Sequence, residues 1–167
     1  MLRHSPEKIG LTLDEAGWAD IDTLIRLANQ HHRSLSRAII EEVVATNDKK
    51  RFAISPDGNS IRASQGHSVS VELGLEPETP PGTLFHGTAT RFLDSIMLQG
   101  LLPGSRQQVH LSVDAETATK VGSRHGKPVI LVVSALKMHD EGHQFYLSEN
   151  GVWLTDSVPA GFLKCQD

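Results

Sequence analysis

The stretch LGLEPETPPGT, residues 73–83, divides the sequence into two parts. It contains three prolines and two glycines in eleven residues, a composition that interrupts helices and strands and is typical of a linker. We therefore predict an N-terminal lobe over residues 1–72, a linker over 73–82 and a C-terminal lobe over 83–167. The patterns on the two sides of the linker differ, and each predicts its own kind of structure.

On the N-terminal side, the sequence predicts two helices followed by a β-hairpin. WADIDTLIRLANQ (18–30) and SLSRAIIEEVVATN (34–47) carry apolar residues at helical spacing, with Ser34 as the expected N-cap of the second helix. RFAISPDGNSIRAS (51–64) places two alternating segments around a Pro-Asp-Gly-Asn turn. This order is typical of a winged helix, which presents its second helix and hairpin to nucleic acid. A small helical domain with a hairpin and no ligand is the alternative.

On the C-terminal side, strands and helices do not alternate as strict βαβ units. The expected strands are TLFHGT (83–88), QVHLS (108–112), PVILVVSA (128–135) and GVWLT (151–155), and the expected helices cover 89–99, closed by Gly100, and 114–126. This pattern predicts an α+β lobe built on a mostly antiparallel, curved sheet. The sequence has no GxGxxG and no Walker A motif, which argues against the commonest dinucleotide and nucleotide folds.

Composition excludes several classes of protein. The net charge of −4 gives no global sign of a nucleic-acid partner, so a polyanion would have to meet a local patch such as Lys49, Lys50 and Arg51. The single cysteine, Cys165, excludes an intrachain disulfide framework, and the nine histidines lack the spacing of metal motifs, so we expect no metal. There is no transmembrane-length apolar run and no signal-peptide core; we expect a cytoplasmic, monomeric protein.

Three short segments carry a polar group from a strand into a turn. They are FHGT (85–88), RQQVHLS (106–112) and ENGVWL (149–154), and two of them supply a histidine. Together they resemble the ADP-ribosyltransferase superfamily, in which an NAD pocket is built from three strand motifs. The resemblance implies that the C-terminal lobe holds NAD.

Blocks along nearly the whole chain resemble one family more closely, the KptA family of RNA 2′-phosphotransferases. They are LRHSPEKIGLTLDEAGWADIDTL (2–24), DKKRF (48–52), IRASQGHS (61–68), FHGT (85–88), GLLPGSRQQVHLS (100–112) and NGVWLT (150–155), in the order of the family. The resemblance implies an N-terminal winged-helix lobe that holds RNA and a C-terminal ADP-ribosyltransferase lobe that holds NAD.

The resemblance also assigns candidate residues. The essential Arg-His-Arg-Arg set of the family falls on Arg3, His4, Arg51 and Arg106. Expected NAD contacts are His86, Gly87, Thr88, His110, Ser112 and Val152, with Gly87 allowing close backbone approach and Thr88 beginning a helix whose amides face the pyrophosphate. Lys49, Lys50, Arg62 and His67 are candidate RNA or phosphate contacts, although Arg62 and His67 could equally brace the two lobes. We expect Trp18 and Trp153 to belong to the core.

The implied reaction consumes NAD to remove an internal 2′-phosphate from RNA, as arises at tRNA splice junctions. It passes through an ADP-ribosylated phosphate and yields a 2′-hydroxyl, nicotinamide and ADP-ribose 1″,2″-cyclic phosphate. Arginines suit this chemistry because their planar forks grip phosphate and stay charged. Two alternatives stay open: an ADP-ribosyltransferase that acts on nucleic-acid phosphate ends or on protein, and a noncatalytic winged-helix nucleic-acid binder.

Overall fold

The computed structural model describes residues 1–166, which form two compact units. The first unit is Met1–Gly74, and the second begins at Leu75. The chain is a mixed α/β protein with five α-helices in its described part and three small sheets, in which all strand pairings are antiparallel. No helix of these residues is both long and apolar enough to cross a membrane, and no cluster of three or more metal-ligating side chains occurs among them.

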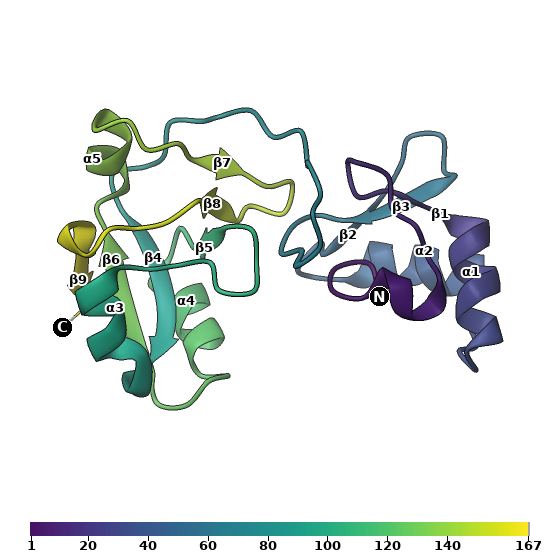
Figure 1. Cartoon of the computed structure of the whole chain (residues 1–167), viewed down its shortest axis with the longest axis horizontal. Helices are drawn as coiled ribbons and strands as arrows, with labels where there is room; N and C mark the ends of the chain where they lie inside the picture. Colours follow the sequence, from purple (N-terminus) through teal and green to yellow (C-terminus); the bar gives the residue numbers. More distant parts are fainter. Residues whose placement is uncertain (167) are drawn as a thin grey trace. The chain divides into compact units, whose positions relative to one another are not determined.

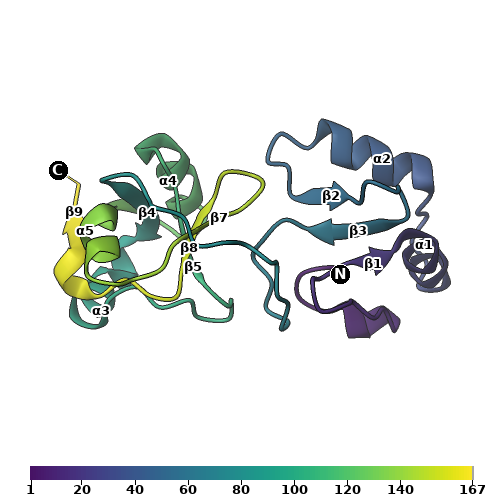
Figure 2. The ribbon, with the colours of Figure 1, turned by 90° about the horizontal axis from the view of Figure 1, so that it is seen from above.

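The first unit places two helices beside a three-stranded sheet. Its elements are the 3-10 turn η1 (Pro6–Ile9), β1 (Ala19–Asp20), α1 (Ile21–Gln30), α2 (Arg37–Thr46), β2 (Phe52–Ile54) and β3 (Ser60–Ala63). The strand order is β1-β3-β2, so β3 lies in the centre. Figure 2 shows α2 on the side of β2 and the N-terminal segment on the side of β1.

Local sequence explains where these elements begin and turn. The side chain of Asp20 caps α1 by accepting a hydrogen bond of 2.7 Å from the Thr23 amide. Ser36 caps α2 through the Ile39 amide at 3.3 Å, so the prediction that Ser34 is the cap was wrong by two residues. The predicted hairpin is confirmed as β2 and β3, joined by a turn in which Gly58 adopts a φ of +74°.

The core of the first unit includes the start of the chain. Leu2 has an exposed fraction of only 7% and packs with apolar residues of η1, the strands and both helices. Other buried members are Ile9, Leu11, Ala19, Ile21, Leu24, Ile40, Ile61 and Ala63. Burial of Leu2 matters for the site because the two residues that follow it are Arg3 and His4.

The second unit contains two further three-stranded sheets. Its elements are β4 (Leu84–Ala89), η2 (Thr90–Phe92), α3 (Leu93–Gln99), β5 (Val109–Leu111), α4 (Ala115–Gly122), β6 (Pro128–Val133), α5 (Ala135–Asp140), β7 (Tyr146–Leu147), β8 (Trp153–Thr155), η3 (Ala160–Phe162) and β9 (Leu163–Cys165). The sheet orders are β4-β6-β9 and β5-β8-β7. Figures 1 and 2 show α3 and α4 on opposite sides of the first of these sheets.

Helix α4 lies unusually close to β4 because two glycines face each other there. A Cβ on Gly87 would overlap the carbonyl oxygen of Ala118, and a Cβ on Gly122 would come within 2.7 Å of the Thr88 carbonyl oxygen. The close approach that Gly87 permits is therefore that of α4. The helix backbone occupies the space where a side chain at this position would point, and contact between the Gly87 backbone and NAD stays a prediction.

Other sequence predictions for this unit need correction. Thr88 does not begin a helix: it is a buried residue of β4, and the helical residues after it begin at Thr90. Helix α4 ends at Gly122 and not at Gly126, the expected end, whereas its cap, Asp114, lies at the expected start. The strand expected over 128–135 is β6, which ends at Val133, and helix α5, which begins two residues later, was not predicted.

Candidate functional site

One short segment of the first unit holds the backbone of three of the cationic residues that the sequence singled out. The segment Ser64–Ser68 directly follows β3. The amide of Ser64 donates to the Arg51 carbonyl at 3.0 Å, and its hydroxyl donates to the Lys50 carbonyl at 2.7 Å. At the other end, the amide of Ser68 donates to the Arg3 carbonyl at 2.9 Å. Arg3 and the pair Lys50 and Arg51, which are far apart in the sequence, are thus both hydrogen-bonded to the segment Ser64–Ser68.

His67 lies within this cluster and is almost fully buried, with an exposed fraction of 2%. Burial, together with the positive charges of Arg3, His4 and Arg62, lowers the pKa of His67 to about 4. The ring is therefore neutral at pH 7 and packs against the backbone of Gly17. Neither ring nitrogen has a hydrogen-bond partner within the described chain. His67 belongs to the interior of the first unit; whether it also contacts RNA stays a prediction.

We expect this buried imidazole to make the protein sensitive to acid. The unfolded chain takes up a proton at His67 near pH 6.5, whereas the folded chain does so only near pH 4, so stability falls as the pH drops through this window. The His67 contribution should reach at most about 3 kcal/mol near pH 4. Urea denaturation at pH 7 and pH 4.5 should show a smaller acid loss in His67→Gln than in the wild type. The exposed His31→Gln variant is the control, and equal losses in all three proteins would contradict the expectation.

Arg62 is held by an aromatic ring. Its guanidinium carbon lies 4.5 Å from the centre of the Trp18 ring, a cation–π contact that orients the charge. Trp18 is only half-buried and is not part of the core cluster, so its assignment to the core was wrong. Trp153, by contrast, is confirmed as a core residue of the second unit.

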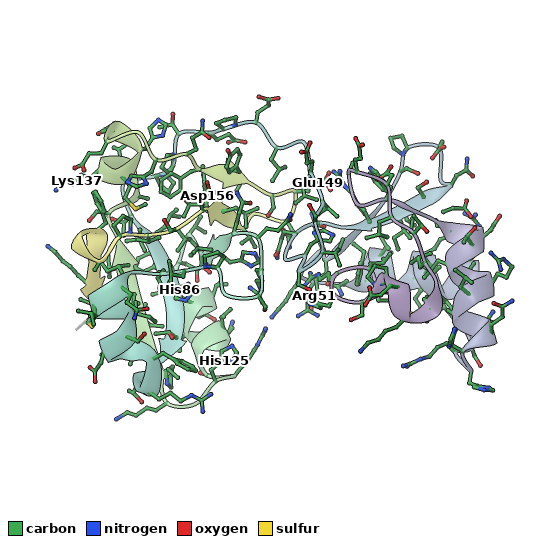
Figure 3. The ribbon with its side chains drawn as sticks, viewed as in Figure 1. Arg51, His86, His125, Lys137, Glu149 and Asp156 are labelled. Carbon is green, nitrogen blue, oxygen red and sulfur yellow. The ribbon has the colours of Figure 1, made fainter. Side chains whose placement is uncertain are left out.

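The remaining basic candidates of the first unit lie in the turn between α2 and β2. Lys49 and Lys50 are tied to Asn47, through its side-chain oxygen at 3.1 Å and its carbonyl at 2.8 Å respectively. Lys50 has a φ of +41°, a strained conformation for a residue with a side chain. Arg51 follows directly and pairs through its backbone with Ser64, and Figure 3 labels its position. The turn therefore presents three consecutive basic residues.

In the second unit, the strand-end motifs meet through backbone pairing. Phe85 and Ser112 exchange two hydrogen bonds of 2.8 Å, which join β4 to the end of β5. The ring of His86 donates from Nδ1 to the His110 carbonyl at 3.0 Å. The register of β5 and β8 places Val152 at the same end of the sheet as Ser112. His86, His110 and Ser112 are thus brought together, with Val152 at the same sheet end.

The hydrogen bond to a carbonyl fixes which form of His86 is present. A carbonyl oxygen only accepts, so Nδ1 carries the proton and Nε2 of the neutral ring is an acceptor. Burial, followed by the charges of Arg106 and His125, lowers the pKa of His86, although the bond to His110 partly opposes this. The ring can therefore accept a hydrogen bond from a hydroxyl group. Figure 3 labels His86 on β4 and His125 beyond the end of α4.

Arg106 is held by the side chain of His110. The guanidinium Nη1 donates to Nδ1 of His110 at 2.8 Å, because arginine has no acceptor atom. The partner is a neutral ring, so this contact orients the arginine without neutralising its charge. Arg106, His110 and His86 form a connected chain of hydrogen bonds in one unit, suited to a ligand with hydroxyl and phosphate groups.

Two surface hollows lie away from these side chains. One of about 350 Å³ lies between α4 and β6, and another of about 610 Å³ lies at the connection between α1 and α2. Neither contains any of the predicted site residues. Sequence reasoning missed Ser64, Ser68 and the role of Trp18, because their partners are distant in sequence and no local pattern marks them.

Comparison with known proteins points to one family throughout. The sequence profile described as "RNA 2'-phosphotransferase, Tpt1 / KptA family" matches residues 1–157. A protein of Acaryochloris marina is 60% identical over 162 residues, covering 97% of this chain and 90% of the relative. One of Agrobacterium fabrum is 58% identical, with 98% and 88% covered, and one of Burkholderia lata is 59% identical, with 100% and 87% covered. All three bear the name "Probable RNA 2'-phosphotransferase".

Proposed function

The chain belongs to the RNA 2′-phosphotransferase, Tpt1 / KptA family, and from this membership we propose that it removes an internal 2′-phosphate from RNA by transferring the phosphate to NAD. The observation that carries the proposal is that the matched residues, 1–157, contain both side-chain clusters, the one around Ser64–Ser68 and the one around His86. The first cluster is cationic and suits a phosphate dianion, and the second suits a ligand with ribose hydroxyls.

The first unit would supply the charge that holds the RNA phosphate. In the proposed assignment, Arg3, His4 and Arg51 contact the 2′-phosphate, with support from Lys49, Lys50 and Arg62. The planar guanidinium groups grip two phosphate oxygens at once, and the bonds from Ser64 and Ser68 support the backbone of three of these residues, Arg3, Lys50 and Arg51. The name winged helix stays a prediction for this unit.

The second unit would bind NAD. Nε2 of His86 is the acceptor that a ribose hydroxyl requires, and His110, Ser112 and Val152 lie close by at the ends of their strands. Gly87 would contribute its backbone beside the face that α4 covers, and Thr88 follows it as a buried residue of β4. In this proposal the second unit is an ADP-ribosyltransferase lobe, and its ligand is NAD.

The proposed reaction has two steps. In the first, an oxygen of the RNA 2′-phosphate attacks C1″ of the nicotinamide ribose, and nicotinamide leaves with the electrons of the broken C–N bond. In the second, O2″ of the same ribose attacks phosphorus, and the bond to the RNA 2′-oxygen breaks. The proton of O2″ ends on the RNA 2′-oxygen, which leaves a hydroxyl and ADP-ribose 1″,2″-cyclic phosphate. Arg3, His4, Arg51 and Arg106 would stabilise the charge that develops on the phosphate oxygens.

The test uses an RNA oligonucleotide with a single internal 2′-phosphate. We expect the wild-type protein to release one nicotinamide per phosphate removed and to form the cyclic phosphate only when NAD is present. The same oligonucleotide with a 2′-hydroxyl is the control and should release no nicotinamide. Equal phosphate loss without NAD would refute the proposal. RNA that keeps ADP-ribose on its phosphate would indicate the alternative, an ADP-ribosyltransferase of nucleic-acid phosphates.

Three further features stay predictions: action on tRNA splice junctions, a cytoplasmic location and a monomeric state. They rest on the family resemblance and on composition.

A further inference from the structure

Ser68 is an exposed residue that forms hydrogen bonds with two of the proposed catalytic residues, Arg3 and His4. Its side chain is exposed, so it contributes nothing to the core. Yet its hydroxyl oxygen lies 3.0 Å from Nδ1 of His4 and 3.5 Å from the carbonyl oxygen of Arg3. Its amide also donates to that same carbonyl at 2.9 Å. A residue 64 positions away along the chain therefore holds both the backbone and the ring at the Arg-His pair.

Only one arrangement of hydrogens satisfies both side-chain contacts, the short one to the His4 ring and the longer one to the Arg3 carbonyl. The carbonyl oxygen of Arg3 only accepts, whereas the hydroxyl of Ser68 has a single hydrogen to donate. Both contacts are satisfied when that hydrogen points to the carbonyl and the His4 ring donates from Nδ1 to the hydroxyl oxygen. The same arrangement persists when the ring is protonated, because Nδ1 then still carries a hydrogen.

We propose that Ser68 is a positioning residue that holds His4 with its proton on Nδ1 and so assigns Nε2 to the RNA phosphate. This inference rests on the proposed function, because it gives a part to His4 in phosphate transfer. With Nδ1 engaged by Ser68, the proton that His4 gives to or takes from the phosphate passes through Nε2. Ser68 touches neither substrate; it acts through the orientation of the ring.

Three variants distinguish the effect of the Ser68 hydroxyl from the effect of its backbone amide. Ser68→Ala removes the hydroxyl but keeps the amide that donates to Arg3. Ser68→Thr restores a hydroxyl at the same place. Ser70→Ala, two residues along the same segment and also exposed, is the matched control. We expect kcat to fall about tenfold in Ser68→Ala, the size of one hydrogen bond to a group that becomes charged. The KM for NAD should not change, and Ser68→Thr should recover most of the rate.

A second readout follows the ring itself and does not depend on activity. Nitrogen-15 NMR of the histidine rings distinguishes a protonated Nδ1 from an unprotonated one, and a His4→Gln protein identifies the signals of His4. In the wild type and in Ser68→Thr, His4 should carry its proton mainly on Nδ1 when neutral. In Ser68→Ala the population should move toward the form protonated on Nε2.

These measurements distinguish a failure of the inference about Ser68 from a failure of the proposed function. If the populations of His4 are the same in the wild type and Ser68→Ala, the inference is overturned, even where the rate falls. It is equally overturned if Ser70→Ala slows the reaction as much as Ser68→Ala. A wild-type protein that leaves 2′-phosphorylated RNA unchanged would refute the proposed function, while the ring measurement would still decide the role of Ser68.

Discussion

Replacement of Arg106 by alanine is expected to stop the proposed reaction halfway, so that RNA carrying a 2′-phospho-ADP-ribose adduct builds up. The first step gains from the positive charge that the nicotinamide ring carries in NAD, because this charge is neutralised when the ring leaves with the electrons of the C–N bond. The second moves phosphorus between two alcohols of similar basicity and has no such drive. It depends more on groups that stabilise negative charge on the phosphate oxygens, and the loss of one such group costs about 10²–10³ in rate.

The structure gives Arg106 the features that this role requires. Its guanidinium is oriented by a bond of 2.8 Å to Nδ1 of His110. An imidazole partner of this kind leaves the positive charge available, whereas a carboxylate would have neutralised it. Arg106→Lys should also be impaired, because an ammonium group cannot reproduce the planar fork.

The measurement is a single-turnover reaction with labelled RNA, separated on a denaturing gel. The adduct should appear as a slowly migrating band in Arg106→Ala and should be transient or absent in the wild type. Arg91→Ala is the matched control, since Arg91 belongs to the same unit, is exposed and rests over the ring of Phe92. Reduced activity without any adduct would show that Arg106 does not act mainly in the second step.

Replacement of Gly87 by alanine should destabilise the second unit severely. The added methyl group would overlap the carbonyl oxygen of Ala118, which is backbone and cannot turn aside as a side chain would. Helix α4 cannot simply move away, because Ala118 is completely buried against β4. Overpacking in cores costs about 1–3 kcal/mol, and we expect about 3 kcal/mol or more here because backbone must shift.

Urea denaturation of the full chain measures this effect. Gly161→Ala provides the control: nothing lies within 4 Å of the place that its methyl group would take, and its φ is not in the left-handed region. The stability of this control should change by about 0.5 kcal/mol or less. If Gly87→Ala is as stable as Gly161→Ala, the helix and the strand are less tightly packed than the structure indicates.

The sequence predicted those features that depend on neighbouring residues. The Pro-Asp-Gly-Asn turn predicted the hairpin of β2 and β3, because a turn and its flanking strands are determined within a few residues. The two helices of the first unit were predicted from the spacing of apolar residues, yet the cap of α2 was misplaced from Ser36 to Ser34. Both serines precede the same apolar stripe, so the local pattern does not distinguish them.

Features that depend on distant contacts were not predictable. The bonds that join Ser68 to Arg3 and His4 connect the start of the chain to the segment after β3, and no periodicity in the sequence indicates such a pairing. Gly87 was singled out as an NAD contact, which stays a prediction, and its packing against α4 was missed because the sequence does not show that α4 folds back onto β4. The cation–π contact of Trp18 was missed because an aromatic residue among apolar ones looks like core.

The two tryptophans of the chain fall one to each unit, in surroundings of opposite character. Trp153 is buried in an apolar core, whereas the half-buried ring of Trp18 lies beneath the guanidinium of Arg62. The protein therefore carries a natural fluorophore in each half. With Trp153 replaced by phenylalanine, the remaining emission comes from the ring beside the proposed RNA-binding cations. With Trp18 replaced, the emission comes from the unit proposed to hold NAD. Ligand binding to each unit can therefore be followed by intrinsic tryptophan fluorescence, without an attached dye.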